Sequence, residues 1–215
     1  KKIVGLSYAA DRTRFHWIDD EMRKIQEKLE ASLPDTVHRP RQFAADGSKI
    51  IYLSTSVRDS GVYYLFDRQT QKVNELAVIK PGIDPDQMAA MKPVTYPARD
   101  GLTLHGYLTL PRGRAAKNLP LILHPHGGPF GIRDEWNYND EVQFYANRGF
   151  AVLQVNYRGS GGYGRAYEAA GFKKWGLEMQ DDLSDGVKWC IAQGIADPAR
   201  VVISGASYGG YATMA

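Results

Sequence analysis

The chain has 215 residues, of which 43% are hydrophobic and 24% are charged. A chain of this length holds one large domain or two small ones, and this composition excludes a disordered or fibrous protein. The net charge of +3 comes from 27 basic and 24 acidic residues, without a run long enough for a nucleic-acid stripe or a polybasic membrane anchor. No apolar stretch approaches the ~18 residues of a membrane span. We therefore expect neither nucleic acid nor a membrane as a partner.

Residues 1 to about 92 follow the pattern of short strands separated by polar turns, which indicates an all-β unit. Three clear strands and a fourth candidate at residues 41–43 fall within about 40 residues, the size of one β-propeller blade. Because a single blade cannot bury its faces, we expect this segment to be about one to two blades of a larger array. The predicted strands cover residues 3–8, 14–18, 49–56, 62–66 and 72–78.

One helix is predicted inside this β-rich segment, over residues 19–33. Its apolar residues recur at helical spacing, acidic residues occupy its first turn, where the helix dipole favours them, and Pro34 ends it. Glutamates balance the basic residues on its other face, so a solvated face is favoured over a membrane-surface or calmodulin-like role.

The pattern changes after the linker-like stretch Pro81-Gly82-Ile83-Asp84-Pro85-Asp86, and we place a domain boundary between residues 92 and 93. Strands then alternate with helices, which predicts an α/β fold with a mostly parallel sheet covered on both faces. The predicted strands cover residues 94–96, 102–110, 119–124, 150–156 and 201–205, and the helices residues 140–147 and 181–193.

A G-x-S-x-G pattern centred on Ser207 follows the last of these strands. In a nucleophile elbow, glycines two places either side of the serine allow a tight strand-to-helix turn that exposes the serine oxygen. The same turn points the backbone amide of Tyr208 at the place where a tetrahedral oxyanion would form. A chance glycine-rich turn is the alternative, but the apolar strand before it and the small residues after it match the required setting.

A second motif, His126-Gly127-Gly128-Pro129, follows the strand at residues 119–124. Paired glycines let the backbone pass close to a ligand with its amides facing inward, as in the oxyanion loop of α/β-hydrolases. We expect the second oxyanion amide to come from Gly128 or its neighbour Gly127, and His126 to order the loop by hydrogen bonding. A plain turn before Pro129 is the alternative.

The loop from Asn156 to Gly164 is glycine-rich but lacks the sequence of a phosphate-binding loop, so a structural loop near the active face is favoured. Within it, Arg158 is expected either to contact substrate and support the glycine loop or to form a salt bridge in the scaffold. The single cysteine, Cys190, has the spacing of a core residue, and the five histidines show no metal-binding spacing. We expect no metal site and no cofactor.

Taken together, these motifs resemble the prolyl oligopeptidase family of serine peptidases, in its acylaminoacyl-peptidase-like branch. The resemblance covers the second half of the chain strongly and the β-rich half weakly. It rests on the motifs at residues 126–129, 156–164, 175–176, 181–187 and 205–211, supported by Trp136 and by residues 100–106.

The resemblance implies a β-propeller over residues 1–92, ahead of an α/β-hydrolase domain that begins at residue 93. It implies hydrolysis of short peptides through an acyl-enzyme on Ser207, with the amides of Tyr208 and Gly128 as the oxyanion hole. An exported location is favoured over a cytoplasmic one, because this branch includes exported bacterial enzymes, and any signal would precede Lys1.

The family's aspartate and histidine follow the serine in sequence, and only eight residues remain after Ser207. We therefore expect the 215 residues alone to be inactive, and their first partner to be the rest of their own polypeptide. A carboxylesterase and a non-catalytic binding or scaffold fragment remain as alternatives. Peptide specificity, exo- against endopeptidase action and oligomeric state are left open by the sequence.

Overall fold

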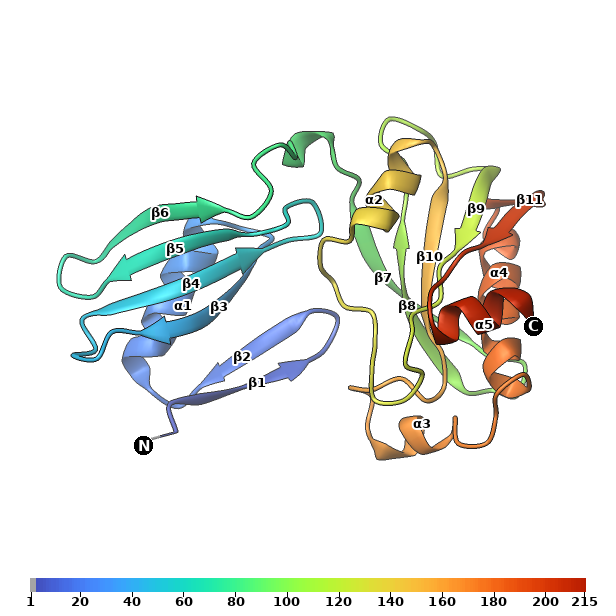
Figure 1. Cartoon of the computed structure of the whole chain (residues 1–215), viewed down its shortest axis with the longest axis horizontal. Coiled ribbons are helices and arrows are strands. Elements are labelled where there is room, and N and C mark those ends of the chain that lie inside the picture. Colours follow the sequence, from blue (N-terminus) through green and yellow to red (C-terminus); the bar gives the residue numbers. More distant parts are fainter. Residues whose placement is uncertain (1–2) are drawn as a thin grey trace. The chain divides into compact units, whose positions relative to one another are not determined.

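A computed structural model describes residues 3–215, which divide into two compact units (Figure 1). The first unit runs to Met88 and includes Asn137–Asn139. The second consists of Ala89–Trp136 and Asp140–Ala215. No helix in the described part of the chain is long and apolar enough to cross a bilayer.

The first unit is built on an antiparallel sheet of four strands in sequence order, preceded by a separate hairpin. The first strand of the sheet, the fourth candidate expected only at residues 41–43, begins at Val37, where it pairs with Thr55. A register shift between Pro40 and Gln42 breaks its alternation, which is why the sequence pattern hid most of this strand. The sheet strands are β3 (Val37–Phe43), β4 (Lys49–Thr55), β5 (Val62–Asp67) and β6 (Lys72–Val78), and the hairpin is β1 (Gly5–Ala9) with β2 (Thr13–Trp17).

Helix α1 (Asp20–Ser32) confirms the helix predicted from residue 19. The Asp19 side chain accepts hydrogen bonds from the amides of Glu21 and Met22, both at 3.1 Å, and so caps the helix. The apolar face of the helix packs on strands β4 and β5, where it forms the core of this unit. The buried members of that core are Met22, Ile25, Leu29, Ile50, Tyr52 and Phe66.

The second unit contains a five-stranded sheet in the order β11-β9-β10-β8-β7. Only β11, β9 and β10 run parallel, whereas β8 is antiparallel to both β10 and β7. The strands are β7 (Met91–Pro97), β8 (Thr103–Thr109), β9 (Leu119–Leu123), β10 (Ala151–Asn156) and β11 (Ala196–Ile203). The helices are α2 (Asp140–Asn147), α3 (Arg165–Ala169), α4 (Glu178–Ala192) and α5 (Tyr208–Met214).

The expectation of a mostly parallel sheet was therefore wrong, although the α/β class is correct. The reason lies in the connections, because a parallel crossover needs about a dozen residues or more. Only residues 98–102 join β7 to β8, and residues 110–118 join β8 to β9 without a helix. The sheet is mixed, with its parallel strands after the loop at residue 118.

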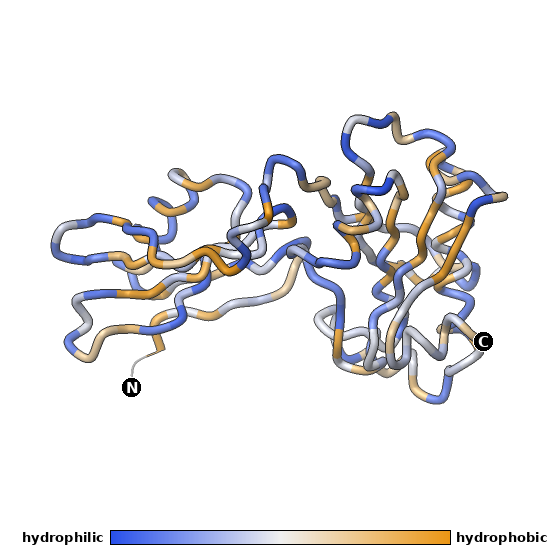
Figure 2. Tube along the Cα trace, turned by 45° about the horizontal axis from the view of Figure 1, so that its top comes forward, coloured by the Kyte–Doolittle hydropathy of each residue, from blue (hydrophilic) through white to orange (hydrophobic). Residues whose placement is uncertain are grey.

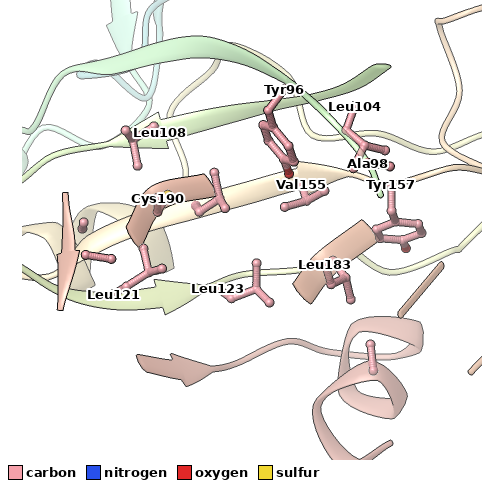
Figure 3. Close-up of a cluster of buried hydrophobic side chains, with 14 of the residues drawn as sticks. Tyr96, Ala98, Leu104, Leu108, Leu121, Leu123, Val155, Tyr157, Leu183 and Cys190 are labelled. Carbon is pink, nitrogen blue, oxygen red and sulfur yellow. The ribbon is translucent and has the colours of Figure 1, made fainter. Parts of the chain in front are cut away.

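The core of the second unit lies between the sheet and α4 (Figure 3), and Figure 2 shows hydrophobic residues concentrated along the strands. Leu121, Leu153 and Leu183 are among its fully buried side chains. Cys190 belongs to the same core, and burial raises the pKa of its thiol to about 12. The thiol is thus neutral and packed, as its spacing predicted.

Candidate active site

Ser207 lies in the turn between β11 and α5 with backbone angles φ 58° and ψ −122°. A positive φ is uncommon for a residue with a side chain, and such strain concentrates at functional sites. The turn is held at its far side by the Tyr211 amide, which donates to the Ser207 carbonyl at 3.0 Å. The geometry is that of the strand-to-helix turn predicted from the motif.

The two flanking glycines are required by contact with the loop that follows β9. A Cβ on Gly205 would lie 2.8 Å from the Pro125 carbonyl oxygen, and a Cβ on Gly209 would collide with the same oxygen. On the other side of the contact, a Cβ on Gly127 would lie 3.3 Å from the Ser207 Cβ and 3.8 Å from its Oγ. The structure thus places the two glycine motifs against each other, with the serine between them.

Gly127 borders this turn, and Gly128 follows it in the same loop. Gly128 has φ 122°, a conformation that side chains rarely adopt. Within residues 3–215, neither of these two amides has a hydrogen-bond partner. Gly127 borders Ser207, and the N–H groups of Gly127 and Gly128 can both donate hydrogen bonds to an anionic oxygen.

His126 is buried beneath this loop and faces away from solvent. Its Nδ1 lies 2.7 Å from the Gly127 carbonyl oxygen, and its Nε2 lies 2.9 Å from the Ser160 Oγ. Burial lowers the pKa of the ring to about 4, so it is neutral near pH 7. In the neutral ring Nδ1 carries the proton and donates to the Gly127 carbonyl oxygen, while Nε2 contacts the Ser160 hydroxyl, whose own proton goes to the Tyr157 carbonyl oxygen at 2.7 Å.

The other histidines of the second unit also have partners. His124 Nδ1 lies 2.8 Å from the Ser204 carbonyl oxygen, and its Nε2 lies 3.3 Å from a Glu141 carboxylate oxygen. His105 stacks on the Tyr163 ring with centroids 4.3 Å apart. Among the described residues, no group of His, Cys, Asp or Glu side chains is arranged to hold a metal ion.

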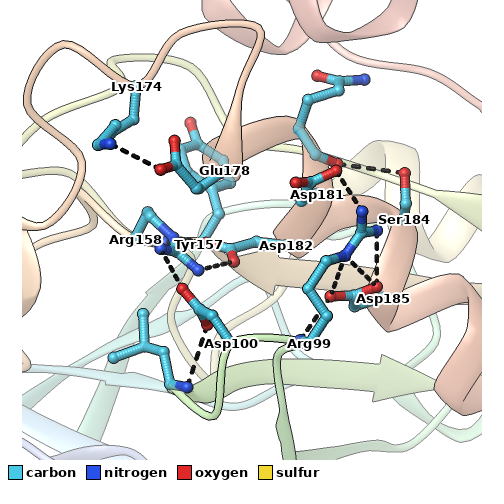
Figure 4. A network of polar contacts seen from close by, with 12 residues as sticks. Arg99, Asp100, Tyr157, Arg158, Lys174, Glu178, Asp181, Asp182, Ser184 and Asp185 are labelled. Carbon is cyan, nitrogen blue, oxygen red and sulfur yellow. Dashed lines mark hydrogen bonds and ion pairs between the residues drawn. The ribbon is translucent and has the colours of Figure 1, made fainter.

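Arg158 lies in a buried ion network (Figure 4). Its Nε and Nη2 donate to the two carboxylate oxygens of Asp182 at 2.8 and 2.7 Å, and its Nη1 donates to Asp100 at 2.8 Å. These hydrogen bonds, of which those donated to Asp182 have the largest effect, raise the pKa of Arg158 further above its usual range. The network ties the glycine-rich loop to α4 and to the β7–β8 turn. Of the two roles expected for Arg158, these contacts favour the scaffold role.

Asp134 was not expected from the sequence, because no motif surrounds it. Its Oδ1 accepts from Gln154 Nε2 at 2.8 Å, and its backbone bonds to the Asn156 side chain. Its Oδ2 and the Gln154 Oε1 are buried without a partner among the described residues. Burial raises the pKa of the Asp134 carboxyl to about 7, against the weaker opposing effects of Gln154 and Arg133.

The raised pKa of Asp134 predicts a pH-dependent stability that Asp134→Asn should remove. Between about pH 4 and pH 7 the folded state holds a proton that the unfolded state has released, so stability falls as pH rises, by at most about 1.4 kcal/mol per pH unit. The free energy of unfolding of the variant, relative to that of wild type, should therefore increase as the pH rises from about 4 to about 7. Above pH 7 the difference between the two proteins should stay constant. Denaturant unfolding of the complete protein at pH 4, 5.5 and 8 measures the difference.

Asp197 supplies the control for this titration. Hydrogen bonds from the Ala199 amide and from Arg200 lower the pKa of its partly exposed carboxyl. The ionised Asp197 carboxylate stabilises the fold fully above its ordinary pKa, and this stabilisation is lost only in acid. The difference in free energy of unfolding between Asp197→Asn and wild type should therefore stay constant from pH 5 to pH 8. A flat difference for Asp134→Asn as well would contradict the prediction.

Comparison with known proteins agrees with this geometry. Residues 136–215 match the sequence profile of the prolyl oligopeptidase family. "Dipeptidyl aminopeptidase BIII" of Pseudoxanthomonas mexicana is 39% identical over 220 residues, which cover 99% of this chain and 32% of that protein. A puromycin-hydrolyzing peptidase of Mycobacterium tuberculosis superposes on 98% of this chain and 33% of its own, with a TM-score of 0.77 and 26% identity. Acylaminoacyl peptidase of Pyrococcus horikoshii covers 82% of this chain and 28% of its own, with a TM-score of 0.66 and 28% identity.

The chain belongs to the prolyl oligopeptidase family, as its motifs predicted. It spans a third or less of the length of the curated relatives that it matches.

Proposed function

We propose that the complete protein is a serine peptidase in which Ser207 forms an acyl-enzyme with short peptides. The observation that carries this proposal is the strained turn at Ser207 packed against Gly127, in a loop where the amides of Gly127 and Gly128 are unpaired among the described residues. In the proposed roles, Ser207 is the nucleophile, the amides of Tyr208 and Gly128 hold the oxyanion, and the amide of Gly127 assists them.

The proposed reaction is acyl transfer in two stages. The Ser207 Oγ bonds to the carbonyl carbon of the peptide while a histidine takes its proton, and the same histidine returns that proton to the departing amine. Water then attacks the ester carbonyl while the histidine takes a proton from the water and returns it to the Ser207 Oγ, which releases the peptide acid. Each stage passes through a tetrahedral oxyanion, and the amide donors stabilise it more strongly than the flat carbonyl.

We further propose that the histidine and its aspartate come from outside these 215 residues, so that the segment alone is inactive. The contacts of His124 and His126 support this, because both nitrogens of each ring already lie against a group other than Ser207. His105 stacks on Tyr163 and contacts Tyr167 edge-on. Removal of the base in a related triad costs about 10⁶-fold in turnover.

Residues 1–92 are proposed to be the end of a β-propeller and residues 93–215 the start of an α/β-hydrolase domain. Four consecutive antiparallel strands, β3 to β6, have the size and order of one blade. A propeller over the active face would restrict substrates to short peptides. The names of the relatives, a dipeptidyl aminopeptidase and an acylaminoacyl peptidase, support peptides as the substrate class.

Labelling and turnover of the complete protein test this proposal together. A fluorophosphonate probe should modify Ser207, as read by peptide mass mapping, and peptide anilides should be hydrolysed. Hydrolysis of nitrophenyl esters without cleavage of any peptide anilide would instead identify a carboxylesterase. Absence of labelling at Ser207 would overturn both enzyme assignments and leave a binding or scaffold role.

A further inference from the structure

Tyr157 lies between the two glycine motifs, at the start of the loop that follows β10. Its side chain is fully buried, and its hydroxyl donates to the His126 carbonyl oxygen at 2.8 Å. Its ring stacks on the His126 ring, with centroids 4.4 Å apart and planes 16° apart. No step of the proposed acyl transfer uses this residue.

The hydroxyl of Tyr157 determines the direction of a loop amide through the planarity of the peptide unit. In a trans peptide, the C=O of one residue and the N–H of the next point in opposite directions. A hydrogen bond that holds the His126 C=O therefore also holds the Gly127 N–H on the opposite side. That N–H has no partner within the described residues and belongs to the glycine whose Cβ position borders Ser207.

The next peptide unit is held in the same way by the His126 ring. Its Nδ1 contacts the Gly127 C=O at 2.7 Å, which aims the Gly128 N–H in the opposite direction. The ring itself is held by Ser160, at 2.9 Å from Nε2, and by its stacking on Tyr157. Tyr157 therefore supports one amide directly and the other through His126.

Tyr157 also contacts the residue that supplies the remaining amide. The centroid of its ring lies 5.3 Å from the centroid of the Tyr208 ring, which in turn lies 5.0 Å from the centroid of the Trp175 ring. A single buried ring thus touches the residues before Gly127 and after Ser207. Side chains packed at this density transmit small displacements to their neighbours.

We propose that Tyr157 is a positioning residue that sets the loop amides of Gly127 and Gly128 relative to Ser207. This inference rests on the proposed function, since it assigns Tyr157 to the oxyanion hole of that reaction. Tyr157 does not touch the substrate. It acts through the His126 carbonyl and ring, so its loss should weaken binding of the tetrahedral state more than binding of the substrate.

Tyr157→Phe in the complete protein tests the proposal, because it removes the hydroxyl and keeps the ring. The turnover number kcat should fall about 10- to 100-fold while KM changes less than about twofold, since displaced donors affect only the charged transition state. The rate of fluorophosphonate labelling at Ser207 should fall by a similar factor. Affinity for a peptide boronate, which mimics the tetrahedral state, should weaken in parallel.

Tyr107→Phe is the matched control, because Tyr107 is also buried and its hydroxyl also forms a hydrogen bond, accepting from Arg133 Nη2 at 3.0 Å. Both variants should lose similar thermal stability, but the control should keep kcat and the labelling rate. Equal activity of Tyr157→Phe and wild type, or equal losses in both variants, would overturn the positioning role. A wild-type protein that is not labelled at Ser207 would instead overturn the proposed function and this inference with it.

Discussion

Replacement of Ser207 by alanine should reduce peptide turnover by the complete protein about 10⁶-fold, to the background rate, and abolish fluorophosphonate labelling. The size of the effect follows from the loss of the attacking oxygen, since loss of the serine costs about this factor in a well-studied triad enzyme. The Ser207 backbone already adopts φ 58°, and alanine keeps the same Cβ, so the fold should be retained. Turnover of a peptide anilide and circular dichroism of the purified variant measure both effects.

Ser204→Ala is the control for this substitution. Ser204 lies three residues earlier, and its Oγ pairs with the Tyr145 hydroxyl at 3.1 Å instead of facing the loop glycines. The variant should keep its labelling and most of its turnover. Substantial activity of Ser207→Ala, or labelling that moves to another residue without loss of rate, would show that the nucleophile has been assigned wrongly.

Replacement of Asp182 by alanine should lower the free energy of unfolding by about 3–5 kcal/mol, because it leaves the buried Arg158 charge with only the partly exposed Asp100 as partner. It also removes the acceptor for the Arg158 amide, 2.9 Å away. The loop that carries Tyr157 loses its attachment to α4, so activity should fall as well. The midpoint of urea unfolding, followed in the complete protein, measures the loss.

Two further variants separate charge burial from ordinary surface effects. Lys174→Ala breaks a 2.6 Å ion pair with Glu178 in which both side chains are more than a third exposed, and it should change the midpoint far less. The double variant Arg158→Met/Asp182→Leu removes both buried charges and should recover part of the stability lost in Asp182→Ala. A double variant no more stable than Asp182→Ala would contradict the account of a buried, unpaired charge.

The sequence predicted the positions of helices and strands wherever hydrophobic residues followed a single period, either that of a helix or that of a strand. The spacing of Met22, Ile25 and Leu29 predicted α1, because a helix buried on one face has apolar residues at every third or fourth position. The apolar run of β10 predicted a central strand, because such a strand is buried on both faces. The sequence did not predict the short helix α3, because five residues are too few to show a hydrophobic period. It also missed most of β3, because a register shift interrupts the alternation of that strand. Strand direction in the sheet also escaped, because it depends on which strands become neighbours.

The sequence by itself supplied the motifs on which the proposed chemistry rests, a serine between two glycines and a glycine pair after an earlier strand, and it indicated the family to which they belong. These motifs can be recognised in the sequence because only glycine fits the tight backbone turns at these positions. Only the tertiary structure decided that Gly127 lies against Ser207, that Tyr157 joins His126 to Tyr208, and that Arg158 is enclosed by Asp182 and Asp100. These contacts join residues 24 to 80 positions apart, and no spacing rule predicts contacts that arise from the packing of strands and helices.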